Sequence, residues 1–182
     1  MFESPIYSYY RVENLSNPTR SKRNQGMDIG VFGSQSDRQT NFICEAVEFY
    51  ASILMDEDVY RDMKIDIELD YELDVAGHCL TDDELEFPRE FTIDINPNLC
   101  DIGIYSTLAH EMVHVKQYAL GELYNVMALS PEEILSFDRV WKGEKWFPKE
   151  NDHPYFDAPW EVEAFGKEVG LYWKWKHRNM KV

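Results

Sequence analysis

Apolar residues recur every three or four positions in several stretches of this chain, which is the spacing of an amphipathic helix. The clearest stretches are residues 37–55 and 102–120. Asp37 stands at an N-cap position for the first helix, while Asp101 and Gly121 flank the second as its start and stop signals. We therefore expect two long helices, each packing one face against a core.

Two further helices are expected in the last third of the chain. The run Ser130-Pro131-Glu132-Glu133 has the pattern of a capping box and predicts a short helix over 131–140. Residues 141–154 have the composition of a loop. The last helix is expected from 159 to about 176, with one buried stripe: Trp160, Ala164, Leu171 and Trp175.

Alternation of apolar and polar residues predicts strands between the two long helices. Residues 63–70 alternate cleanly, residues 91–96 do so again before Pro97, and 73–80 is a weaker candidate. Residues 1–36 are rich in proline, glycine and small polar residues, which predicts an irregular N-terminal arm before one domain over 37–182. The fold class expected is α+β: a single compact domain whose small, mostly antiparallel sheet packs on the helix 102–120 and its flanking helices.

The net charge of −16 is unevenly distributed. Residues 56–101 contain 16 Asp and Glu against three basic residues, a net charge of −13 (3 minus 16). Such a surface repels nucleic-acid phosphates, so no nucleic-acid partner is expected; it either suits a basic protein substrate or, as is more usual, is a solvated acidic face that serves solubility. No apolar run has the length of a membrane span, no signal peptide is visible, and the three cysteines form no C-x-x-C. A cytoplasmic protein without a membrane partner is expected.

The predicted helix 102–120 contains His110-Glu111-Met112-Val113-His114, which has the pattern H-E-x-x-H. Residues four apart lie on one face of a helix, so both imidazoles can bind one Zn²⁺ while Glu111 serves as the general base. A strand pair leading into such a helix is the zincin arrangement. The segment 91–96 is then either the strand beside the cleft or an interior strand.

A catalytic zinc needs a third protein ligand, and the residues after His114 must supply it. Two acidic residues of the last helix are candidates, Glu161 and Glu163, which lie about 200° apart around a helix so that only one can face the zinc. His153 and Asp157 are the other candidates, although Asp157 also suits an N-cap. An oxyanion-stabilising group is expected too, and the candidates are Tyr155, His153 and Tyr118.

Three stretches resemble a known family: Pro88 to Ile95, Leu108 to Tyr118, and Pro159 to Gly166. They are similar to small zinc metallopeptidases of tailed bacteriophages and some bacteria, often described as SprT-like. The resemblance covers roughly residues 60–175. It implies a compact zincin domain with gluzincin-like ligation, in which the first Glu of the E-x-E-A pattern, here Glu161, binds the metal.

The expected function is therefore a zinc-dependent metallopeptidase, which acts on a protein or peptide in the host cytoplasm if the chain is phage-encoded. Its site would comprise His110, His114 and Glu161 as zinc ligands and Glu111 as the catalytic base. Two alternatives stay open. The first is a zinc-containing binding or inhibitor module that captures a host protein without catalysis, and the second is a zinc amidase on a non-peptide substrate.

Overall fold

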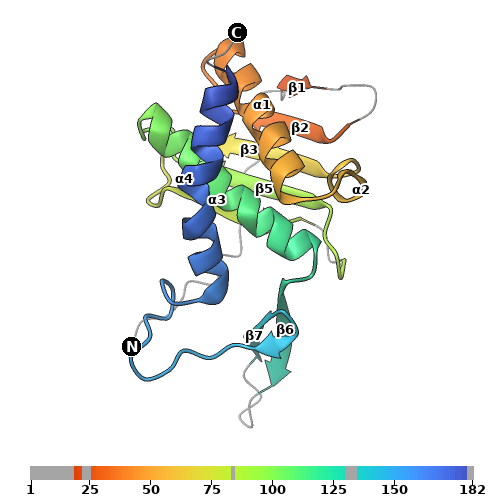
Figure 1. Ribbon diagram of the computed structural model, residues 1–182, viewed down its shortest axis with the longest axis vertical. Coiled ribbons are helices and arrows are strands. Elements are labelled where there is room, and N and C mark those ends of the chain that lie inside the picture. The colour runs from red at the N-terminus through yellow and green to blue at the C-terminus, as the bar shows by residue number, and fades with distance from the viewer. Residues whose placement is uncertain (1–18, 22–25, 83–84, 130–134, 180–182) are drawn as a thin grey trace.

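A computed structural model of the protein describes residues 19–21, 26–82, 85–129 and 135–179 (Figure 1). The described elements form a mixed α+β fold with two sheets. The main sheet has the strand order β1-β2-β3-β5-β4. Its strands are β1 (Thr19–Ser21), β2 (Asp28–Phe32), β3 (Lys64–Leu69), β4 (Gly77–Thr81) and β5 (Glu90–Ile95).

The main sheet is mixed, whereas the sequence analysis expected it to be mostly antiparallel. Its central strands β2, β3 and β5 run parallel, and only the outer strands β1 and β4 are antiparallel to their neighbours. Between β2 and β3 the chain crosses over through α1 (Asp37–Leu54) and α2 (Glu57–Tyr60), which is the long connection that a parallel pair requires. Residues 91–96 form an interior strand, because β5 lies between β3 and β4. The edge strand on that side of the sheet is β4.

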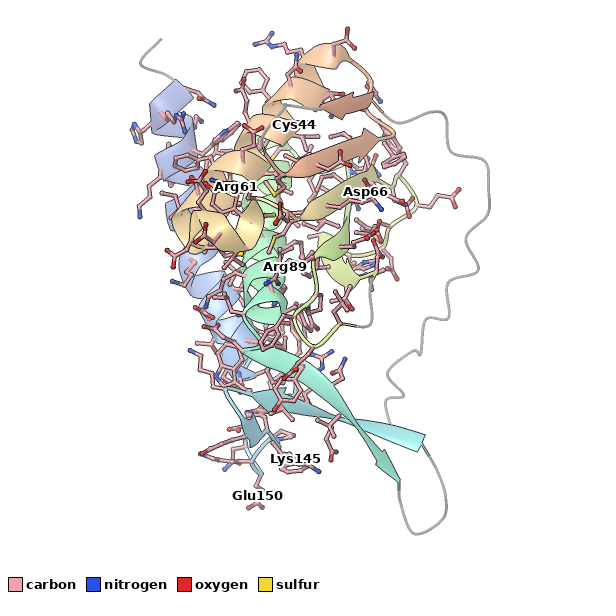
Figure 2. All side chains as sticks on the ribbon, turned by 90° about the vertical axis from the view of Figure 1, so that its right-hand side faces the viewer. Cys44, Arg61, Asp66, Arg89, Lys145 and Glu150 are labelled. Carbon is pink, nitrogen blue, oxygen red and sulfur yellow. The ribbon has the colours of Figure 1, made fainter. Side chains whose placement is uncertain are left out.

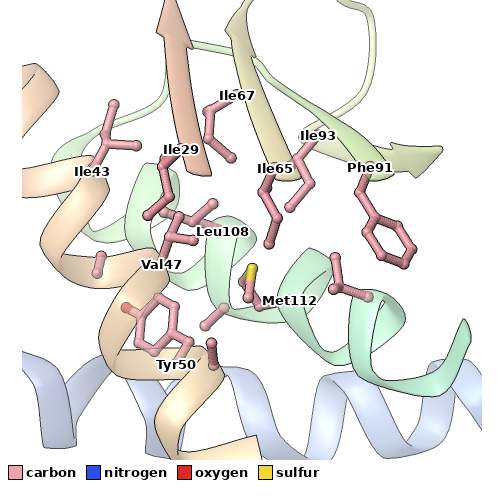
Figure 3. Close-up of a cluster of buried hydrophobic side chains, with 14 of the residues drawn as sticks. Ile29, Ile43, Val47, Tyr50, Ile65, Ile67, Phe91, Ile93, Leu108 and Met112 are labelled. Atoms are coloured by element: carbon pink, nitrogen blue, oxygen red, sulfur yellow. The ribbon is translucent and has the colours of Figure 1, made fainter. Parts of the chain in front are cut away.

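The described helices pack in layers on one face of the main sheet. Next to the sheet lie α1 and α3 (Asp101–Ala119), and α4 (Pro159–Asn179) crosses α3 on its outer side (Figures 1 and 3). Ser36 rather than Asp37 caps α1, and Asp101 is the first residue of α3 rather than its cap. None of the described helices has both the length and the apolar character that crossing a bilayer requires.

The main core fills the space between the sheet, α1 and α3. Alternate residues of β3 and β5 point into it, so the strict period of two that predicted these strands also identifies their buried face. Burying one such side chain stabilises the fold by about 1.5–3 kcal/mol relative to leaving it exposed. Figure 3 shows the central members: Ile29, Ile65, Ile67, Phe91 and Ile93 from the sheet, Ile43, Val47 and Tyr50 from α1, and Leu108 and Met112 from α3.

A second sheet projects from the end of α3 (Figure 1). It consists of β6 (Leu123–Leu129), β7 (Leu135–Trp141) and the short β8 (Glu144–Lys145). Figure 2 shows Lys145 and Glu150 at this far end of the molecule. A small cluster of Leu123, Ala158 and Trp160 joins the hairpin to the start of α4.

Two sequence expectations about these segments are wrong. The helix expected over 131–140 is absent from residues 135–140, which form β7 and pair with β6; residues 130–134 lie outside the described part of the chain. The arm expected over 1–36 contains β2, which pairs with β3 inside the sheet, so the domain begins before residue 37. Residues 1–18 and 22–25 also lie outside the described part. The helices expected at 37–55, 102–120 and 159–176 are confirmed as α1, α3 and α4.

Candidate metal centre

Helix α3 is the platform of the candidate site. Every residue from Leu108 to Gln117 is buried, because this part of the helix lies between the sheet and α4. Leu108 and Met112 face the sheet, while the two histidines of the H-E-x-x-H motif reach α4. The helix ends at Ala119, and Gly121 adopts a positive φ of 65° that turns the chain toward β6.

His110, His114 and Glu161 come together between α3 and α4. The Glu161 Oε2 atom lies 3.3 Å from His110 Nε2 and 3.6 Å from His114 Nε2. All three residues are buried, with 4–8% of their surface exposed. Their ligand atoms lie within 4.8 Å of one another, and they form a group that could hold a metal ion. The ligand set expected from the sequence is therefore gathered in one place.

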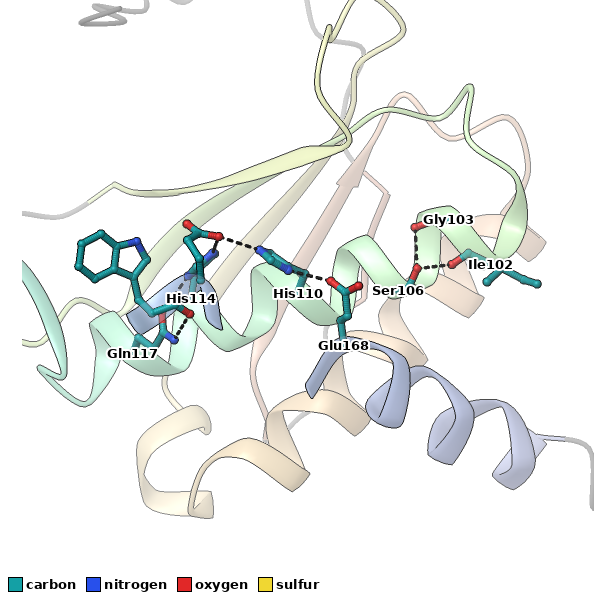
Figure 4. A network of polar contacts seen from close by, with 9 residues as sticks. Ile102, Gly103, Ser106, His110, His114, Gln117 and Glu168 are labelled. Carbon is teal, nitrogen blue, oxygen red and sulfur yellow. Dashed lines mark hydrogen bonds and ion pairs between the residues drawn. The ribbon is translucent and has the colours of Figure 1, made fainter. Parts of the chain in front are cut away.

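A carboxylate of α4 orients His110. The His110 Nδ1 atom lies 2.8 Å from Glu168 Oε2, as Figure 4 shows. With its hydrogen on Nδ1 donated to that carboxylate, His110 keeps the lone pair of Nε2 for a metal. The Phe165 ring and the imidazole meet in an edge-to-face contact, with 4.6 Å between ring centroids. Sequence analysis did not identify Glu168, although it follows Glu161 by seven residues and so lies two turns further along the same face.

A neutral amide orients His114. The Gln117 Oε1 atom accepts a hydrogen bond from His114 Nδ1 at 2.8 Å, which leaves His114 Nε2 free to bind metal (Figure 4). The Nε2 group of Gln117 donates to the Trp160 carbonyl and to Glu163, both at 3.0 Å. Gln117 is 0% exposed. This side chain thus fixes one histidine and at the same time joins α3 to the start of α4.

Glu163 is directed away from the metal group. Its carboxylate accepts hydrogen bonds from Gln117 and from Lys116 Nζ, the latter at 3.0 Å. Lys116 also pairs with Glu122 just beyond the end of α3. Of the two acidic residues that the sequence offered as third ligand, the structure brings Glu161 to the histidines and uses Glu163 to support Gln117.

The electrostatics of the metal-free group follow from burial and pairing. Burial opposes ionisation of Glu161, but the hydrogen bond from His110 and the close contact with His114 outweigh it and lower its pKa to about 2. Burial also opposes protonation of His110, yet its contact with Glu161 leads to a raised pKa. Glu111 is 5% exposed, and burial raises the pKa of its carboxyl. A carboxylate with a raised pKa is a better proton acceptor near neutral pH.

The three residues considered for oxyanion stabilisation lie in different surroundings. The Tyr155 hydroxyl interacts with the Glu161 carboxylate, and burial together with this negative charge raises the pKa of Tyr155. Tyr118, one turn after His114, has its pKa raised to about 12 by burial. The ring of His153 instead accepts hydrogen bonds from the backbone N–H groups of Tyr155 and Phe156.

The remaining ligand candidates are not part of the group. His153 is exposed, and its backbone N–H donates to the Asp157 carboxylate at 2.6 Å. Asp157 therefore stabilises the turn before α4 by accepting from a residue that precedes the helix, which is not the hydrogen bond of the N-cap role expected for it. Tyr155 alone among the oxyanion candidates touches one of the three gathered ligands.

The edge strand β4 runs beside the metal centre. Glu111 interacts electrostatically with His78 and Cys79 of β4 as well as with the two histidines. His78 Nε2 is paired with Asp94 Oδ2 of β5 at 2.8 Å. Glu111, which the motif predicts to be the general base, thus lies between the three gathered residues and the edge strand β4.

Comparisons with protein-family models, with curated proteins and with solved structures found no match to this chain.

Proposed function

We propose that the protein is a zinc-dependent metallopeptidase. The observation that carries the proposal is the gathering of His110, His114 and Glu161 with a buried Glu111 beside them. Two imidazoles, one carboxylate and an open fourth position are a donor set of catalytic zinc. Ligands at about 2.0–2.1 Å from a tetrahedral ion stand roughly 3.3–3.4 Å apart. The separations of 3.3 and 3.6 Å between Glu161 and the histidines agree with that spacing.

Zinc bound there would polarise a scissile carbonyl and lower the pKa of a water molecule. Glu111 accepts a proton from the attacking water as its oxygen joins the carbonyl carbon. When the carbon–nitrogen bond breaks, Glu111 passes that proton to the departing amine nitrogen. The Tyr155 hydroxyl donates a hydrogen bond to the carbonyl oxygen as negative charge develops on it.

The edge strand supports a peptide as the substrate. On its outer side β4 has no neighbour among the described strands, and an extended peptide can add there through main-chain hydrogen bonds. A peptide in that place would pass Glu111. A non-peptide amide would make no use of such an edge, so β4 favours the peptidase over the amidase.

The test compares the wild type with Glu111→Gln on a mixture of unstructured peptides, with cleavage products measured by mass spectrometry and zinc measured in both proteins. We expect both to hold zinc and the variant to cleave more slowly by about 10²–10⁴-fold, the usual contribution of a general base. A wild type that holds zinc and cuts no peptide would overturn the proposal. If the wild type and Glu111→Gln then bound the same host protein equally well, the non-catalytic binding module would replace the peptidase as the proposed function.

A further inference from the structure

A cavity of about 910 Å³ lies between the β4–β5 connection, the end of α3 and the start of β6. Two of the lining residues, Leu123 and Pro88, are apolar and buried. Its walls include the rings of Phe87, Tyr118 and Tyr124. A concave site of this size is large enough for one or two long side chains of a peptide.

Arg89 holds the wall of the cavity against α3. Its Nη1 group donates hydrogen bonds to the carbonyls of Phe87, Pro88 and Ala119, at 3.1, 2.8 and 2.9 Å. Figure 2 shows Arg89 beside α3. The Phe87 ring packs on Gly121, where a Cβ atom would stand 2.7 Å from a ring carbon. The cavity is therefore fixed to the helix that carries the metal-binding histidines.

The cavity adjoins the metal centre. Tyr118, which lines it, follows His114 by one helical turn and interacts electrostatically with Glu111 and Glu161. Thr81, also in the lining, is the last residue of β4. A peptide that lies along β4 past Glu111 therefore reaches this cavity within a few residues, since each residue of a strand advances about 3.3 Å.

The chemistry of the cavity matches a basic side chain. Asp82 and Glu86 stand in its lining, which includes no Lys, Arg or His among the described residues. Aromatic faces suit the aliphatic stem and the cation of Lys or Arg, and the carboxylates suit its charge. The surrounding acidic segment, with its net charge of −13 (3 minus 16) over 56–101, would attract a basic peptide.

We propose that this cavity binds a Lys or Arg side chain of the substrate peptide, close to the bond that is cut. The proposal rests on the peptidase function proposed above. It assigns a specificity to the enzyme, namely extended peptides that carry a basic residue near the scissile bond.

The test measures binding without turnover. Zinc-loaded Glu111→Gln protein is titrated with fluorescently labelled, alanine-rich octapeptides that carry a single Lys, Arg, norleucine or Glu. We expect the Lys and Arg peptides to bind at least about tenfold more tightly than the norleucine peptide, the effect of a good charge-assisted hydrogen bond. The additional changes Asp82→Asn and Glu86→Gln should remove this preference and leave the zinc content unchanged.

A matched control carries Glu72→Gln and Asp74→Asn instead, which remove two exposed charges from the same acidic segment outside the cavity. It should keep the preference. The proposal would be overturned if the Asp82/Glu86 and Glu72/Asp74 variants lost the preference for Lys and Arg peptides equally. It would also be overturned if the parent protein showed no such preference or bound no peptide. Cleavage by the wild type separates the subsite from the peptidase function. Cleavage at equal rates with and without a basic residue would overturn the subsite and keep the peptidase. Binding of basic peptides without any cleavage would overturn the peptidase and keep a cavity that binds basic side chains.

Discussion

The two sides of the metal centre are held in different ways. On one side His110 is oriented by Glu168, a carboxylate whose side chain is 24% exposed and which bonds the Nδ1 atom of His110. On the other side His114 is oriented by Gln117, a fully buried amide that also bonds Trp160 and Glu163. The first support tunes one ligand, whereas the second belongs to the packing of α3 on α4. A change at Glu168 should therefore alter metal affinity with little effect on fold stability, whereas a change at Gln117 should alter both.

Gln117→Leu should have the largest effect. It leaves the Trp160 carbonyl and His114 Nδ1 without their buried partner, and each such group costs about 1–3 kcal/mol. The free energy of unfolding should fall by about 2–6 kcal/mol, and zinc affinity should fall with it. Urea unfolding of the metal-free protein measures the first quantity, and competition with a chelator measures the second. Unchanged unfolding would contradict the structural role given to Gln117.

Glu168→Gln should weaken zinc binding with little change in stability. Loss of the charged partner of a metal-binding histidine usually costs about 10–100-fold in affinity. Because Glu168 is partly exposed, unfolding of the metal-free variant should stay close to that of the wild type. The change Lys174→Gln, at an exposed residue further along the same helix, is the control. A fall in stability as large as that of Gln117→Leu would erase the contrast between the two sides.

Lys116→Met tests how far the support of His114 extends. Lys116 bridges Glu163 and Glu122, and its removal leaves Glu163 with less compensation. We expect the free energy of unfolding to fall by about 1.5–3 kcal/mol, the size of a hydrogen bond to a charged group. Zinc affinity should change less than in Glu168→Gln, since Gln117 still holds His114. If Lys116→Met instead weakened the free energy of zinc binding more than the free energy of unfolding, Lys116 would support the metal-binding residues directly.

The smallest effect is expected at His78, which is paired with Asp94 outside the ligand set. The hydrogen bond to Asp94 raises the pKa of His78, although burial opposes this. A raised folded-state pKa means that the pair stabilises the fold fully below about 6.5, the ordinary histidine value, and that this contribution is lost as pH rises through the folded pKa. Histidine titration by NMR in wild type and Asp94→Asn should show a lower pKa for His78 in the variant.

The residues of the gathered group were predictable because helical spacing limits the candidates and the family resemblance favours Glu161. His110 and His114 share a face through their spacing of four, and Glu161 and Glu163 cannot both face one point. Their supports depend on how α3 crosses α4, which no local pattern contains. In the sequence, Gln117 follows His114 by three residues and Glu168 follows Glu161 by seven, and neither spacing identifies the hydrogen bond that the side chain makes.

The errors in the fold have a similar cause. Pro131-Glu132-Glu133 has good helix-start residues, but pairing with β6 makes the following residues a strand, because tertiary contacts override local propensity. Asp28–Phe32 contains a glycine and lies in a region rich in loop-forming residues, yet it forms a strand because it pairs in parallel with β3. Parallel pairing depends on a distant crossover, so short strands of this kind carry a weak local signal.

The most direct test of the account is the metal content of the protein. Wild type, Glu161→Ala and Glu163→Ala would be purified without added metal, exposed to zinc, and measured for all first-row transition metals by mass spectrometry. We expect about one zinc per chain in the wild type and in Glu163→Ala, and none in Glu161→Ala. Zinc at the wild-type level in Glu161→Ala, or no zinc in the wild type after zinc is offered, would contradict it.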